Sequence, residues 1–169
     1  MNTNYGKLSR FLQISPVKNT ELLLFSLLVF NFFKTNKNKN ILLLGIPEIV
    51  NPLIIVPYIF KLGFLNFRRK RYFVRLKNHL VGTFSIVEAS NSIHIYSLTV
   101  GPQWRKLGIA TFILSCLEAQ AIRKNKTWLE VSVHKTNNPA LRLYTNFGFI
   151  KIQESRWFFL FRKLIRKSL

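Results

Sequence analysis

A strand, a glycine-containing loop and a helix follow one another between residues 92 and 124, and this succession constrains the fold most. The run SIHIYSLTV at residues 92–100 alternates apolar and polar side chains, which predicts a strand with one buried face. Pro102 ends this strand, and we expect a helix from about Leu107 to Lys124, where apolar residues recur at helical spacing. The segment therefore predicts an α/β chain.

Further strands and helices are expected on both sides of this segment. The segment FLQISPV at residues 11–17 predicts a first strand that ends at Pro16, and a mostly apolar helix follows from Asn19 or Thr20. Beyond residue 70 we expect strands at 71–78, 79–89, 127–134, 149–155 and 156–164, and a helix from Asn137 to Gly148. The expected order is β-α-α-β-β-β-α-β-α-β-β, in which the second helix is given no residue range. It describes a mixed α/β sheet in a single domain of residues 1–169.

The charge balance indicates an anionic partner. The 169 residues include 26 Lys and Arg against 6 Glu and no Asp, a net charge of +20, and 49% are hydrophobic, which excludes a disordered chain. Such a field attracts phosphorylated cofactors, RNA, acidic lipid or acidic protein, although AT-rich codons by themselves would also enrich lysine. One basic cluster is either a solvated strand face or a contact for RNA or the ribosome; it consists of Arg68, Arg69, Lys70 and Arg71.

Two apolar segments near the amino terminus are weak candidates for membrane spans. Residues 22–33 form a run that is shorter than the roughly 20 residues a span needs. Residues 41–65 are long enough, but three prolines and Glu48 interrupt them, which is costly in hydrocarbon. We therefore expect a soluble or peripherally associated protein without a transmembrane span.

The loop before the central helix has the properties of a phosphate-binding turn. The first N–H groups of a helix have no internal partners and carry a partial positive charge, so they can bind a diphosphate directly. Gly108 and Ala110 would let the ligand approach the backbone, and Arg105 and Lys106 add positive charge. The alternative is an ordinary strand-loop-helix connection that happens to contain a glycine.

Two motifs together resemble the GNAT superfamily of N-acetyltransferases. The first is Arg105-x-x-Gly108-x-Ala110 after the strand, and the second is Asn137-x-x-Ala140-x-x-Leu143-Tyr144 with Phe147-Gly148-Phe149. The resemblance implies a mainly antiparallel central sheet flanked by helices, and transfer of an acetyl group from acetyl-CoA to an amine. It also implies an acetyl-CoA-binding core at residues 71–159 and a variable, apolar acceptor-side region at residues 1–65.

The resemblance also assigns residues to the cofactor. The backbone of Leu98, Thr99 and Val100 would pair with the pantetheine arm, and Asn137 and Ala140 would lie along it. The diphosphate would be held by the loop and first helical turn, namely Arg105, Lys106, Leu107, Gly108, Ile109, Ala110 and Thr111. No metal is implied.

Two side chains are candidates for proton transfer. Tyr144 would protonate the leaving thiolate, the alternative being an aromatic that only packs the helix. The strand TWLEVSV is similar to that of bacterial ribosomal-protein alanine N-acetyltransferases, which makes Glu130 the candidate general base and a protein N-terminal or lysine amine the expected acceptor. A merely solvated Glu130 is the alternative, and Glu88 is a weaker candidate base. The segment HKTNNPA, which links this strand to the helix at Asn137, is about two residues longer than the usual link in those enzymes. Near the carboxyl end, ESRWFFLF resembles their Arg-x-Tyr-Tyr sequence, with Phe158 and Phe159 in place of the tyrosines.

The remaining candidate functional residues, three histidines and a cysteine, have weaker support. His79, His94 and His134 show no metal-ligand spacing, although His134 ends a strand near the expected site. Cys116 is expected to be a small core residue.

The alternative function is a binding protein that retains the fold and uses its basic surface on RNA or membrane. The composition suggests an intracellular protein, either plastid-encoded or from the cytoplasm of a low-GC bacterium.

Overall fold

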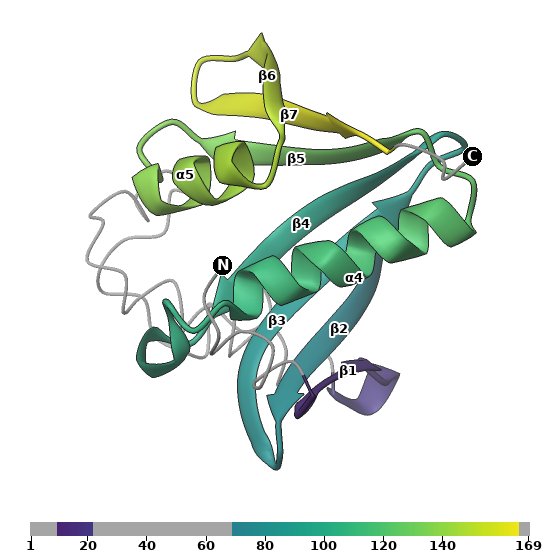
Figure 1. Ribbon diagram of the computed structural model, residues 1–169, viewed down its shortest axis with the longest axis vertical. Coiled ribbons are helices and arrows are strands. Elements are labelled where there is room, and N and C mark those ends of the chain that lie inside the picture. Colours follow the sequence, from purple (N-terminus) through teal and green to yellow (C-terminus); the bar gives the residue numbers. More distant parts are fainter. Residues whose placement is uncertain (1–9, 22–68, 166–169) are drawn as a thin grey trace.

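The computed structural model describes residues 10–21 and 69–165 (Figure 1). Two helices and two short 3-10 turns accompany the strands. The 3-10 turns are η1 (Asn19–Glu21) and η3 (Pro102–Trp104), and the helices are α4 (Ile109–Arg123) and α5 (Asn138–Asn146). The strands are β1 (Leu12–Pro16), β2 (Arg69–Leu76), β3 (His79–Glu88), β4 (Ser92–Val100), β5 (Trp128–His134), β6 (Ile150–Glu154) and β7 (Phe158–Leu164). Of the apolar helix expected after Asn19, only the η1 turn lies within the described residues, and the region from 22 to 65 lies outside them.

All seven strands form one sheet in the order β1-β2-β3-β4-β5-β7-β6. Every neighbouring pair is antiparallel except β4 and β5, which run parallel. Parallel neighbours need a crossover connection, and α4 supplies it by running along one face of the sheet (Figure 1). The predicted mixed, mainly antiparallel sheet is confirmed.

The boundaries of α4 follow from its sequence. Gly108 precedes the helix with φ of 82°, a left-handed conformation that suits glycine, so the helix begins at Ile109 and not at Leu107 as predicted. One stripe of the helix is buried against the sheet and consists of Ile109, Ile113, Leu114, Leu117 and Ala121. Cys116 beside it is half-buried, and burial raises the pKa of its thiol, which fits packing and not nucleophilic chemistry.

The core lies between α4 and the sheet face that α4 covers. On the central strands its members are the alternate residues Phe84, Ile86, Ile93, Ile95, Leu129, Val131 and Val133. The side chains between them, such as His94 and Glu130, therefore lie on the opposite face. This alternation decides which polar residues can meet there.

Two isoleucines of α4 provide a matched test of this packing. Ile113 has no exposed surface, whereas Ile122 is 39% exposed. We expect Ile113→Ala to lower the free energy of unfolding by about 2–5 kcal/mol, because it leaves a cavity in the core. Ile122→Ala should cost about 1 kcal/mol, since less buried surface is lost and solvent can fill the space. Denaturant unfolding followed by circular dichroism measures both, and equal losses would contradict the assigned face of α4.

Candidate functional site

The strands β4 and β5 part after four paired positions. Their register runs from Ser92 opposite Trp128 to Ile95 opposite Val131 and then stops. Beyond it, β4 stays with β3 up to Val100, and β5 stays with β7 up to His134. Figure 1 shows the two strands diverging toward the side where α4 begins and α5 lies. Over this stretch, the edge of β4 that faces β5 has no partner among the described strands, so its backbone groups can pair with an extended ligand.

A bulge in β4 lies where the strands part. Thr83 faces Thr99 and Ser85 faces Tyr96, so Phe84 alone stands opposite two residues of β4. One of the two, Ser97, has φ of 51°, and its carbonyl accepts a hydrogen bond from the Thr99 hydroxyl at 2.9 Å. A bulge bends its strand and increases the local twist, which turns β4 away from β5. The sequence did not reveal this bulge, because serine carries no signal for a left-handed backbone.

Of the predicted cofactor-binding strand residues, Leu98 is the second residue of this bulge and Thr99 follows it. Leu98 is half-buried and Thr99 is buried, whereas Val100 ends the strand. Gly82 on β3 approaches them so closely that a Cβ atom there would lie 2.8 Å from the Thr99 carbonyl oxygen. The predicted residues therefore form one continuous edge of β4, whose other side pairs with β3.

The loop after β4 leads directly to the start of α4. Arg105, Lys106 and Leu107 are exposed, and Arg105 Nε donates a hydrogen bond to the Val100 carbonyl at 3.2 Å. No side chain caps the helix at Gly108. The first internal bond runs from Phe112 N–H to the Gly108 carbonyl, so the earlier amides have no helical acceptor. An uncapped helix start beside two cations fits a bound diphosphate.

The predicted residues of the second motif lie on α5. Asn137 caps this helix, because its side-chain oxygen accepts a hydrogen bond from the Ala140 amide at 3.3 Å. This cap uses only the oxygen, and the contact of Asn137 and Ala140 with a cofactor stays a prediction. The capping role was not foreseen, although an Asn before Asn-Pro is a recognisable N-cap signal.

Tyr144 is the one fully buried residue of α5. It is 5% exposed, and its ring packs edge-on against Phe149 with 5.4 Å between the ring centres. Burial raises the pKa of its phenol, so the hydroxyl stays protonated. Tyr144 is therefore a packed aromatic that also keeps a proton to donate. Its role in catalysis stays a prediction.

Glu130 is tightly engaged by its neighbours. Its Oε1 lies 2.6 Å from Nη2 and 2.9 Å from Nε of Arg162 on β7, and its Oε2 accepts a hydrogen bond from the Ser92 hydroxyl at 3.0 Å. Nδ1 of His94 lies 3.9 Å from the same Oε2. The side chain is 15% exposed, so it is not the solvated carboxylate of the alternative interpretation. The sequence singled out Glu130 but missed the histidine beside it.

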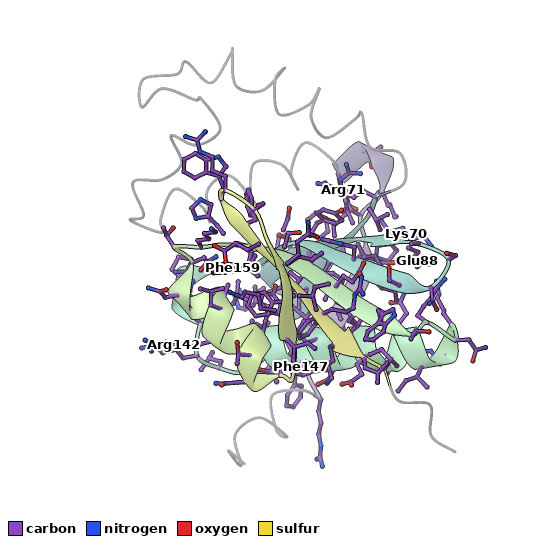
Figure 2. The ribbon with its side chains drawn as sticks, turned by 90° about the horizontal axis from the view of Figure 1, so that it is seen from above. Lys70, Arg71, Glu88, Arg142, Phe147 and Phe159 are labelled. Atoms are coloured by element: carbon purple, nitrogen blue, oxygen red, sulfur yellow. The ribbon has the colours of Figure 1, made fainter. Side chains whose placement is uncertain are left out.

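Glu88, the weaker candidate base, connects three elements instead. Its carboxylate accepts hydrogen bonds from Lys124 at 2.7 and 2.8 Å, from Lys70 at 3.1 Å and from Gln120 at 3.2 Å. These contacts link β2, β3 and the end of α4, and Figure 2 shows Lys70 and Glu88 side by side. The hydrogen bond from Lys124 is the main reason that the pKa of Glu88 is lowered.

The basic cluster does not form one exposed patch among its described members. Lys70 binds Glu88 on the α4 side, whereas Arg69 and Arg71 are half-buried on the opposite side. The guanidinium of Arg69 lies over the Tyr96 ring, and Arg71 donates a hydrogen bond to the Arg69 carbonyl. Arg68 lies outside the described residues. Contact of this cluster with RNA stays a prediction.

Two features are absent from residues 10–21 and 69–165. Neither helix there has the length and apolarity that crossing a bilayer requires. No three side chains of His, Cys, Asp or Glu in those ranges come together in a way that could hold a metal ion.

Comparisons with known proteins agree with this geometry. The profile of the acetyltransferase (GNAT) family matches residues 51–149. The cysteine-rich protein 2-binding proteins of Mus musculus and Homo sapiens are 44% identical over 59 residues, which is 35% of this chain and only 7% of those relatives. The solved structure of the PaiA N-acetyltransferase from Thermoplasma acidophilum, in complex with coenzyme A, has a TM-score of 0.70 at 14% identity, over 90% of this chain and 98% of that one.

A second solved structure has the same fold. The ribosomal-protein-S18-alanine N-acetyltransferase of Escherichia coli has a TM-score of 0.65 at 13% identity and covers 93% of this chain and 96% of its own. At such identities the likeness concerns the fold.

The Glu88 contacts give a pH-dependent prediction. Because the folded-state pKa of Glu88 is lowered, its contribution to stability is present above the ordinary carboxyl value of 4.5 and is lost as the pH falls through the folded-state value. Glu88→Gln should lower the free energy of unfolding by on the order of 1 kcal/mol at pH 7, and the difference should shrink in acid.

Denaturant unfolding at several pH values measures this difference. In combination with Lys124→Met, the loss should be less than additive, because both changes remove the same contact. A difference between wild type and Glu88→Gln that grows in acid would contradict the ion pair.

Proposed function

The chain belongs to the acetyltransferase (GNAT) family, and from that premise we propose that it transfers an acetyl group from acetyl-CoA to a protein N-terminal or lysine amine. The observation that carries this proposal is the edge of β4 from Tyr96 to Val100. On the side that faces β5 it lacks a partner among the described strands, and it leads, through a cationic loop, to the uncapped start of α4. A long ligand with an amide-containing arm and a diphosphate needs both features side by side.

The residues present fit acetyl-CoA, which supplies an activated acetyl thioester. The backbone of Leu98, Thr99 and Val100 would hold the pantetheine arm as an added strand. The amides of Ile109, Ala110 and Thr111, with Arg105 and Lys106 beside them, would bind the diphosphate. Coenzyme A in the similarly folded Thermoplasma acidophilum structure supports this assignment.

The transfer needs two proton movements that side chains can provide. The amine nitrogen attacks the thioester carbon, the C–S bond breaks, and the thiolate must gain a proton while the amine loses one. The buried phenol of Tyr144 keeps its proton and can supply it to the thiolate. For the proton that leaves the amine, the resemblance makes Glu130 on β5 a candidate, and His94 on β4 lies beside it with Nδ1 3.9 Å from its carboxylate.

Two observations support a protein amine as acceptor. The fold is shared with an enzyme named for an alanine of a ribosomal protein. The net charge of +20 also opposes binding of small polycationic amines, whereas an amine carried by an acidic polypeptide would be attracted.

The binding half of the proposal can be tested with two cations of equal charge. Lys106 precedes α4, whereas Arg123 lies in its last turn, at the far end of the helix. We expect Lys106→Ala to weaken acetyl-CoA binding about three- to tenfold and more at low salt, because it removes positive charge next to the diphosphate. Arg123→Ala should leave the affinity nearly unchanged.

Calorimetric titration with acetyl-CoA measures both variants. Absence of binding heat from the wild type at millimolar acetyl-CoA would overturn the proposed function. Salt-sensitive binding to RNA in its place would favour the basic binding protein.

The catalytic half can be tested at one atom. Tyr144→Phe keeps the ring that packs on Phe149 and removes only the hydroxyl. Turnover should fall by about a hundredfold or more, because the thiolate then leaves without its proton donor. Release of free thiol from acetyl-CoA measures turnover, and calorimetry should show unchanged affinity. Unchanged turnover would remove Tyr144 from the mechanism.

A further inference from the structure

A row of polar side chains crosses the sheet on the face opposite α4. We call it the polar row, and it consists of Arg69, Tyr96, His94, Glu130 and Arg162. The guanidinium carbon of Arg69 lies 4.2 Å from the Tyr96 ring centre, and the Tyr96 and His94 rings stack at 4.3 Å. His94 Nδ1 then lies 3.9 Å from Glu130, which is bound to Arg162. Four strands therefore contribute to one connected set of groups.

We propose that His94 takes the proton from the acceptor amine and that Glu130 positions His94 for this step. The inference rests on the proposed acetyl transfer and names the base for it. His94 immediately precedes Ile95, the last residue of β4 that pairs with β5. Its ring therefore lies where the two strands begin to part, on the face that α4 does not cover.

The contacts of Glu130 make it a poor base and a good positioning residue. Both of its oxygens accept hydrogen bonds, one from Arg162 and the other from the Ser92 hydroxyl. Protonation of Glu130 would break the ion pair with Arg162. The same carboxylate favours the histidine tautomer whose proton is on Nδ1, the nitrogen that faces it, and leaves the lone pair on Nε2. Nε2 of His94 lies near the Ser132 hydroxyl at 3.4 Å.

The charges around His94 suit a group that must be neutral before the reaction and cationic after it. Burial lowers the pKa of His94, so the imidazole is neutral at pH 7 and can accept a proton. Glu130 on β5 raises that pKa and Arg69 on β2 lowers it. Arg162 lies beyond Glu130, and Val87 on β3, between Arg69 and His94, carries no charge.

The proton step is balanced. The Nε2 lone pair of His94 takes the N–H proton as the amine nitrogen bonds to the acetyl carbon, and the imidazolium that forms is stabilised by Glu130. The C–S bond breaks in the same transfer, and the thiolate takes its proton from Tyr144. His94 later returns its proton to water, and the Tyr144 phenolate regains one from water, so both groups are restored.

The experiment compares two histidines by the same substitution. His94→Gln removes the proposed base, and His79→Gln changes an exposed histidine at the start of β3. The probe is a synthetic peptide with a free alanine N-terminus and an internal lysine, incubated with acetyl-CoA. We expect His94→Gln to lower kcat about a hundredfold with acetyl-CoA affinity unchanged, and His79→Gln to have no effect.

The pH profile distinguishes the base from its positioning residue. In the wild type, kcat should fall on the acid side as His94 becomes protonated. Glu130→Gln should move this acid limb to lower pH, because the carboxylate that raises the pKa of His94 is gone. An acid limb that persists in His94→Gln and disappears in Glu130→Gln would overturn the inference and make Glu130 the base.

A measurement without turnover completes the test. The imidazole proton signal of His94 is identified by its loss in His94→Gln, and its titration should move to lower pH in Glu130→Gln. A titration unaffected by Glu130→Gln would overturn the pairing. If the wild type binds acetyl-CoA and acetylates the peptide while His94→Gln retains full kcat, only this inference fails. If the wild type binds no acetyl-CoA, the proposed function fails with it.

Discussion

The site depends on β4 and β5 sharing only four paired positions before they part. β4 pairs with β3 up to Val100, its last residue, and β5 pairs with β7 along its whole length. Past Ile95 each strand therefore follows a different neighbour, and the bulge at Ser97 increases the twist that separates them. Backbone groups that would otherwise bond within the sheet are left for a ligand, next to the start of α4.

Carboxylates in the carboxyl-terminal part of the chain act mainly as links between elements. Each of the four in residues 69–165 contacts a cation from another element or turn. The pairs are Glu88 with Lys70 and Lys124, Glu118 with Lys163, Glu130 with Arg162, and Glu154 with Lys135. Because 26 Lys and Arg stand against only 6 acids, cations remain in excess after these pairs form, and the field outside the protein is strongly positive. That field suits a ligand with several phosphate charges.

Much of the fold could be predicted from local patterns, and the departures have local causes. Period-two alternation located β4 and β5, and helical spacing located α4 within two residues at each end. The prediction that α4 begins at Leu107 was wrong, because Gly108 adopts a left-handed conformation and the helix begins after it. The bulge at Ser97 and the ion pair of Glu130 were not predictable, since each depends on the partner strand and not on the neighbouring residues.

The sequence by itself determined the order of elements, the glycine at the helix start, the two family motifs and the positive charge. These properties depend on residues close together in the chain, where spacing alone sets geometry. Only the tertiary structure decided that His94, Glu130 and Arg162 meet, because they lie on three strands whose register is set by the whole sheet. A shift of one residue in either register would move those side chains to the other face.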